Sequence, residues 1–178
     1  MKHTSHSRRV VVTGSECTGK TMLTEGLAEY FSCPSSPEGA RLYVAQHNWP
    51  LTVADVDPIA SLQIALEETA VREAHDLVIH DTDLVSTLVY ACHYYGTSPA
   101  WIVRAASERA ADLYLLCDID LPWVSDGLQR DSGSAEQRRK IHENFVETMT
   151  RTGLHWILIQ GSGEKRLEQA VRTIKALA

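Results

Sequence analysis

Residues 14–21, Gly-Ser-Glu-Cys-Thr-Gly-Lys-Thr, form the segment that most constrains how this chain can fold. They match the phosphate-binding pattern G-x-x-x-x-G-K-S/T. A β-branched segment at 10–12 precedes them, and a helical pattern at 22–31 follows. A strand that turns through such a loop into a helix directs backbone N–H groups and the positive end of the helix dipole at one point. The segment therefore predicts a polyphosphate site; the alternative is a tight glycine turn with an incidental lysine.

The loop also assigns individual roles. Lys20 is expected to reach the β- and γ-phosphates of a nucleoside triphosphate, and the Thr21 hydroxyl to hold Mg²⁺. In the helix that follows, Leu23, Leu27, Tyr30 and Phe31 are expected on one face. The predicted nucleotide contacts in this segment are Gly14, Ser15, Glu16, Cys17, Thr18, Gly19, Lys20, Thr21 and Met22.

The composition is that of a globular protein. The chain has 178 residues, of which 44% are hydrophobic and 22% charged, a size suited to one domain spanning 1–178. The net charge of −6 argues against a nucleic-acid partner. We find neither an apolar run of the ~20 residues that span a bilayer nor a secretory leader, so we expect no membrane partner and a cytoplasmic location, with residues 1–8 flexible. Cys92 and Cys117 are expected to pack as small hydrophobic residues.

Apolar runs at 10–12, 77–81, 113–118 and 155–160 are typical of buried parallel strands, and a weaker run at 40–44 could be a strand or the start of a helix. Segments 32–39 and 96–99 have loop composition. The remaining helical patterns lie at 59–74, 84–92, 101–111, 135–151 and 165–177. This alternation predicts an α/β protein: a three-layer α/β/α P-loop NTPase fold of the nucleoside/nucleotide-kinase type, with a central parallel sheet of about five strands.

Ligands of such sheets bind beyond the carboxyl ends of the strands, so polar residues there are site candidates. Asp81 and Asp83 follow one apolar strand, and one of them is expected to hold Mg²⁺, with Asp81 assigned to the metal and Asp83 able to face a substrate. The alternative role for either is to cap the helix at 84–92. Gly161 and Ser162 follow the last strand and are expected near the nucleotide.

Three further groups could handle an acceptor. Glu38 could orient or deprotonate a hydroxyl and Arg41 could hold a phosphate or sugar, although such a pair is also common on exposed helices. Trp123 could stack on a base while Asp126 accepts from a sugar hydroxyl; the alternative is a core tryptophan beside a capped turn.

The segment 126–140 has the composition of a mobile lid, polar and glycine-spaced at first and basic at 138–140. Within it, Arg130 and Arg138 could stabilise a transferring phosphoryl group. The chain lacks the N-K-x-D and D-x-x-G patterns of GTPases, which leaves a small-molecule kinase or an ATP-hydrolysing module.

Four motifs together resemble the NadR-like kinase group, the ribosylnicotinamide (nicotinamide riboside) kinases. Residues 14–23 resemble the loop G-x-E-S-S/T-G-K-S/T-x-L, and Asp81-Thr82-Asp83 with Thr87 is similar to D-T-D…T. Residues 121–130 resemble P-W-x-x-D-G-x-R, with Gln129 inserted before Arg130, and 38–41 resemble E-Y/F-A-R, with Gly39 in place of the aromatic residue. The likeness spans about residues 9 to 172.

The resemblance implies ATP-dependent phosphorylation of the 5′-hydroxyl of nicotinamide riboside, with MgATP on the loop and Lys20, Glu38, Asp81 and Arg130 as the catalytic residues. It supports Glu38, Arg41, Trp123, Asp126 and Arg130 beyond what the residues alone indicate. The predicted acceptor site comprises Glu38, Arg41, Asp83, Trp123 and Asp126, with Glu38, or Asp83 as the alternative, orienting and activating the acceptor hydroxyl. The alternatives are a kinase of another nucleoside, nucleotide or metabolite, and a regulatory ATP-binding module. The sequence leaves a homodimer open.

Overall fold

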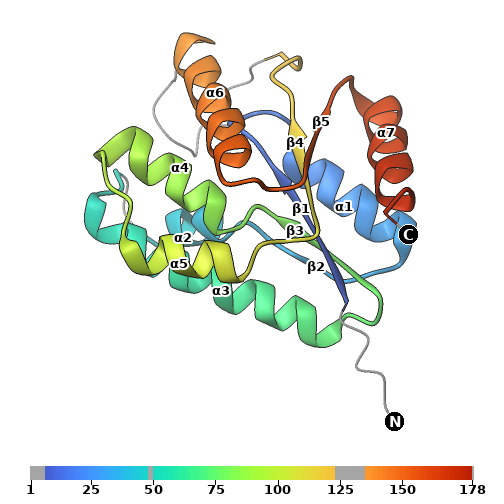
Figure 1. Cartoon of the computed structure of the whole chain (residues 1–178), viewed down its shortest axis with the longest axis horizontal. Helices are drawn as coiled ribbons and strands as arrows, with labels where there is room; N and C mark the ends of the chain where they lie inside the picture. Colours follow the sequence, from blue (N-terminus) through green and yellow to red (C-terminus); the bar gives the residue numbers. More distant parts are fainter. Residues whose placement is uncertain (1–6, 48–49, 123–134, 178) are drawn as a thin grey trace.

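The computed structural model describes residues 7–47, 50–122 and 135–177. Its centre is a parallel sheet of five strands in the order β2-β3-β1-β4-β5 (Figure 1). The strands are β1 (Arg8–Thr13), β2 (Ser35–Ser36), β3 (Leu77–Asp81), β4 (Leu113–Cys117) and β5 (Trp156–Ile159). The register aligns Val12 of β1 with Asp81 of β3 and with Leu115 of β4, so the carboxyl ends of the three central strands lie together.

Helices cover both faces of the sheet. They are α1 (Lys20–Phe31), α2 (Gly39–Gln46), α3 (Val56–Glu73), α4 (Leu84–Tyr95), α5 (Ala100–Glu108), α6 (Ala135–Arg151) and α7 (Gly163–Lys175), with a 3₁₀ turn η1 (Val53–Asp55) before α3. In Figure 1, α1 and α7 lie together on one side of the sheet, and α3 to α6 lie on the other. The predicted three-layer α/β/α fold is confirmed.

Each face of the sheet has its own hydrophobic core because successive strand residues point to opposite faces. Val10 and Val12 of β1 pack with Leu23 and Leu27 of α1 and with residues of α7. Val11, between them, packs with residues of α4, α5 and α6. Val10, Val11 and Val12 are fully buried, which explains why this strand is apolar without alternation.

Three expectations about local structure are wrong. Segment 32–39 was expected as a loop, but it contains β2, an edge strand whose Ser36 Oγ lies 2.8 Å from His80 Nδ1 of β3. Tyr30 of α1 does not join the buried face, because it is 52% exposed. Cys92 is exposed, whereas Cys117 is buried as expected.

The ambiguous run at 40–44 belongs to helix α2, so the helical alternative is confirmed. The other predicted helices and strands occur, with ends that differ by a few residues. None of the helices in the described ranges is both long and apolar enough to cross a membrane.

Candidate active site

The loop between β1 and α1 has the backbone that its glycines predict. Gly14 has a φ of 140°, and a Cβ there would lie 2.9 Å from the Cys117 carbonyl oxygen, so only glycine fits against β4. Gly19 precedes α1 with a φ of 75°. Helix α1 therefore begins at the loop and presents its unpaired N-terminal N–H groups there.

Side chains bind three carbonyl groups of the loop. Lys20 Nζ donates to the Ser15 carbonyl at 2.9 Å. Arg138 of α6 donates to the Cys17 carbonyl at 3.1 Å, and Arg166 of α7 donates to the Thr18 carbonyl. Because cationic donors occupy these carbonyl groups, the polar groups that the loop can offer an anion are its N–H groups.

Arg138 was predicted to contact the nucleotide, and the structure places it against the loop. Its side chain is buried and donates to the Leu121 carbonyl as well as to Cys17. Met22, by contrast, is 78% exposed in the first turn of α1. Glu16 is half-buried within the loop.

Arg166 is a site residue that the sequence analysis missed. It is 3% exposed, forms an ion pair with Asp120, and donates through Nε to the Gly161 carbonyl at 2.7 Å. Gly161 N–H in turn donates to Asp120 Oδ2 at 2.6 Å. Gly161 and Ser162, which were predicted to lie near the nucleotide, follow β5. Arg166 connects this segment to the phosphate-binding loop.

Asp81 and Thr21 meet where β3 and the loop end. Thr21 Oγ1 donates to Asp81 Oδ2 at 2.6 Å. Asp81 Oδ1 is buried and has no hydrogen-bond partner among the described residues. Burial, followed by the negative charge of Glu38, raises the pKa of Asp81 to about 6. A buried carboxylate oxygen with unused acceptor capacity is suited to bind a cation or its water.

The donor set fits Mg²⁺ held together with a polyphosphate. In the described part of the chain, His, Cys, Asp and Glu side chains nowhere form a group of three that could hold a metal ion alone. Mg²⁺ characteristically takes one or two protein oxygens and completes its shell with phosphate oxygens and water. The Thr21 hydroxyl and the Asp81 carboxylate are two such oxygens, and they lie next to each other.

Glu38 immediately precedes α2 and is 7% exposed. Its carboxylate is close enough to Asp81 to raise the pKa of that group. Arg41, one turn along α2, is half exposed, and its Nε lies 3.9 Å from Glu38 Oε2. Glu38, Arg41 and Asp81 thus gather at one place, as the sequence analysis expected of residues that share a site.

Asp83 has a different environment from Asp81. Its side chain accepts from the Val85 N–H at 2.9 Å, which caps α4, and from the Tyr114 hydroxyl at 2.8 Å. Burial raises its pKa. Because both oxygens are already bonded, the geometry favours the helix-capping alternative over contact with a substrate. The candidates Trp123, Asp126 and Arg130 lie outside the described residues.

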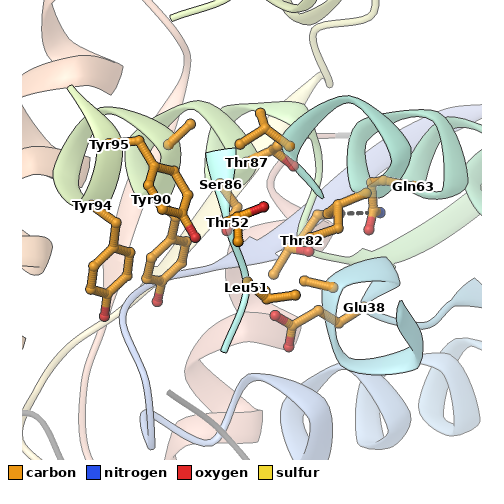
Figure 2. A pocket seen from close by; sticks show the side chains of 14 residues that line it. Glu38, Leu51, Thr52, Gln63, Thr82, Ser86, Thr87, Tyr90, Tyr94 and Tyr95 are labelled. Carbon is orange, nitrogen blue, oxygen red and sulfur yellow. Dashed lines mark hydrogen bonds between the residues drawn. The ribbon is translucent and has the colours of Figure 1, made fainter. Parts of the chain in front are cut away.

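A pocket that is partly open to solvent lies beside Glu38 and Thr82. Figure 2 shows the Glu38 carboxylate at one end of it and the rings of Tyr90, Tyr94 and Tyr95 at the other. Side chains of α3 and α4 line the remainder, together with Ala40 of α2, Leu51 and Thr52 before η1, and Thr82 after β3. The three tyrosines were not predicted as site residues, although their spacing on α4 was an available signal.

The fold and the loop define a P-loop NTPase-fold protein of the nucleoside/nucleotide-kinase type. A family model described as "AAA domain" matches residues 9–166, and the chain belongs to this family.

The expected resemblance to NadR is confirmed. The chain is 30% identical over 157 residues to the trifunctional NAD biosynthesis/regulator protein NadR of Escherichia coli K12, covering 86% of this chain and 38% of the relative. It is 29% identical over 175 residues to NadR of Salmonella typhimurium LT2, covering 96% of this chain and 42% of that protein. The chain therefore spans about two fifths of the length of these relatives.

Solved structures agree on the fold. A NadR protein in complex with NR superposes with a TM-score of 0.83 at 24% identity, over 97% of this chain and 51% of that one. A NadR protein in complex with NAD and AMP-PNP has the same TM-score and sequence identity, over 97% of this chain and 49% of that one. Thymidylate kinase of Ehrlichia chaffeensis has a TM-score of 0.68 at 16% identity, over 97% of this chain and 99% of that one.

Proposed function

We propose that this chain is an ATP-dependent kinase that phosphorylates the 5′-hydroxyl of a nucleoside, and that nicotinamide riboside is its acceptor. The observation that carries the proposal is the position of Asp81 between two functional parts. On one side Thr21 of the phosphate-binding loop donates to it, and on the other the charge of Glu38, which lines the pocket, raises its pKa. A nucleotide site and an acceptor pocket therefore meet at one carboxylate.

Phosphoryl transfer depends mainly on positioning and on offsetting charge. We assign Lys20 to the transferring phosphoryl group, and Thr21 and Asp81 as the residues that would hold Mg²⁺, which would supply positive charge to offset the charge that develops on the phosphoryl group. Glu38 accepts or orients the proton of the acceptor hydroxyl. Its place at the pocket wall supports this role over one for Asp83, which caps α4 and is not among the residues that line the pocket.

The pocket supports an acceptor with a flat ring. Its three tyrosines, opposite the acidic end, can pack against a planar base while the sugar lies towards Glu38 (Figure 2). Arg41, Trp123, Asp126 and Arg130 enter the proposal through the family resemblance, the last three from outside the described residues. We treat residues 1–178 as one kinase domain. Residues 135–140, which were predicted to belong to the lid, form the start of α6.

The decisive experiment is a panel of nucleosides, nucleotides and hydroxylated metabolites incubated with the protein and MgATP, with products identified by mass spectrometry. Nicotinamide riboside should give ADP and the mononucleotide at the highest rate. A faster product from another acceptor would correct the substrate. Tight ATP binding without a phosphorylated product from any compound would favour the regulatory ATP-binding module and refute the kinase.

A further inference from the structure

Gln63 of α3 connects the two turns that carry the proposed catalytic acids. Its side-chain oxygen accepts from the Gly39 N–H at 2.8 Å, and its Nε2 donates to the Thr82 carbonyl at 3.2 Å. Gln63 is 2% exposed, so these bonds are shielded from water. Figure 2 shows the amide directed at Thr82, and the contact is drawn as a dashed line.

The two partners are the residues immediately after the functional acids. Gly39 follows Glu38, and Thr82 follows Asp81. Thr82 has a φ of 64°, a conformation that a threonine adopts only when its surroundings hold it. One side-chain amide therefore helps to fix where Glu38 lies relative to Asp81.

Gly39 permits this close approach. A Cβ on Gly39 would lie 3.0 Å from Gln63 Oε1 and 3.1 Å from the Gln63 backbone nitrogen, closer than ordinary contacts. A larger residue would push α2 away from α3 and lengthen the hydrogen bond. The NadR-like motif E-Y/F-A-R has an aromatic residue at this position. The close contact with Gln63 is a physical reason why this chain has glycine there.

Hydrogen bonds also determine which way round the side-chain amide of Gln63 lies. Gln63 Nε2 donates to Glu67 Oε1 at 3.2 Å, and Glu67 is 1% exposed. Arg9 of β1 and Arg109, just after α5, hold the other oxygen of that carboxylate at 2.9 and 3.5 Å. Because Glu67 and the Thr82 carbonyl both need a donor and Gly39 N–H needs an acceptor, the amide has one satisfactory orientation.

We propose that Gln63 is a positioning residue for phosphoryl transfer, which acts by holding the Glu38 turn and the Asp81 turn at a fixed separation. The inference rests on the proposed function, in which those two acids serve the acceptor and the metal. Gln63 lines part of the acceptor pocket, but its amide is bonded to Gly39, Thr82 and Glu67, and the role we assign to it is to position the two turns. The alternative is that Gln63 only stabilises the packing of α2 on α3.

Replacing Gln63 with Leu removes all three bonds and keeps a similar volume. We expect kcat to fall about 10- to 100-fold, because displacement of catalytic groups by about an ångström has that effect. The KM for MgATP should change less than kcat, since Gln63 bonds to none of the residues of the phosphate-binding loop and acts on Asp81 only through Thr82. Gln63→Glu keeps an acceptor for Gly39 but loses the donor to Thr82, and it should also lower kcat.

Ala70→Gly provides the control for lost stability. Ala70 is buried on the same helix, seven residues beyond Gln63, and glycine there weakens the helix and lowers the melting temperature of the protein. When activity is measured well below the melting temperatures of Ala70→Gly and Gln63→Leu, Ala70→Gly should retain the wild-type kcat. An equal loss of kcat in the two variants would overturn the positioning role, as would a kcat within twofold of wild type in Gln63→Leu.

Hydrogen exchange of the Gly39 amide tests the contact without any turnover. Exchange should accelerate selectively in Gln63→Leu and remain slow in Ala70→Gly. Unchanged exchange in Gln63→Leu would refute the contact. If the wild-type protein phosphorylates no compound while exchange of the Gly39 amide still accelerates in Gln63→Leu, the proposed function is refuted. The connection of the two turns through Gln63 is then still supported. If Gln63→Leu does not fold, Gln63→Glu takes its place in both measurements.

Discussion

The Thr21 hydroxyl donates a 2.6 Å hydrogen bond to Asp81 and thereby joins the end of the phosphate-binding loop to the end of β3. The other oxygen of Asp81 is buried without a partner in the described part of the chain. Leaving a buried carboxylate oxygen unpaired costs free energy, and this cost is a common feature of functional sites. The proposed metal-dependent chemistry therefore depends on the pair Thr21–Asp81.

Asp81→Asn should lower turnover by about 100-fold, because the amide keeps an acceptor for Thr21 but cannot neutralise a cation. The same change should leave the melting temperature in metal-free buffer at pH 8 unchanged or higher. The reason is that burial disfavours the charged form of Asp81, which raises its pKa. Asp76→Asn, at an exposed position before β3, is the control and should change neither quantity. A fully active Asp81→Asn enzyme would exclude Asp81 as the metal ligand.

The raised pKa of Asp81 predicts how metal binding depends on pH. Its pKa in the folded protein is about 6, against an ordinary value of 3.8, so the folded state binds this proton more tightly than the unfolded state does. Its contribution to stability is therefore present below about pH 4 and is lost as the pH rises to about 6.

Mg²⁺ requires the deprotonated form, so affinity for Mg-nucleotide should fall about tenfold between pH 7 and pH 5. Calorimetric titration at several pH values measures this dependence. Asp81→Asn corrects for titration of the nucleotide's own phosphates and should show a flatter profile. Equal profiles in the two proteins would mean that Asp81 does not titrate with metal binding.

Arg166→Met should weaken both ATP binding and the fold. The substitution keeps much of the side-chain length but removes the donors to the Thr18 carbonyl and to Asp120. We expect a higher KM for ATP and a loss of about 1–3 kcal/mol in the free energy of unfolding, measured by denaturant titration. Arg172→Met, which breaks an exposed pair with Glu168 on the same helix, should cost under about 0.5 kcal/mol. Indistinguishable effects would show that Arg166 does not hold the loop.

Lys20→Ala should abolish detectable transfer, with turnover reduced by about 1000-fold or more, because a positioned cation offsets charge on the phosphoryl group in the transition state. Initial rates of ADP formation give the measurement. Lys175→Ala is the matched control, since this lysine lies at the end of α7 and contacts only Tyr30 in the described structure. Unchanged turnover in Lys20→Ala would place the chemistry elsewhere.

Most of the fold was predictable because its signals are local. Glycines at 14 and 19, the valines of β1 and the acid that ends β3 each follow from neighbouring residues and together indicate a parallel sheet with a phosphate-binding loop. β2 escaped prediction because it has only two polar residues, Ser35 and Ser36, between prolines. Its strand conformation depends on pairing with β3, which lies far along the chain.

The residues that support the site were harder to predict because their roles are tertiary. Arg166 has the appearance of a solvated charge on an amphipathic helix until α7 packs beside the loop. Gln63 likewise looks like an ordinary helix residue, and only the fold brings it against Gly39 and Thr82. The tyrosines of α4 become a pocket wall through their position opposite Glu38. Sequence patterns predicted the groups to which we assign the reaction, but they did not indicate the residues that hold those groups.

The central claim is that the γ-phosphoryl group passes from ATP to a nucleoside. The most direct measurement uses ATP labelled at its γ-phosphate, incubated with the protein, Mg²⁺ and nicotinamide riboside. The account predicts that the label appears in the mononucleotide at the rate at which ADP forms, and that Glu38→Gln and Lys20→Ala both suppress this transfer. Label recovered only as inorganic phosphate, or remaining in ATP, with this riboside and with every other nucleoside offered, would contradict it.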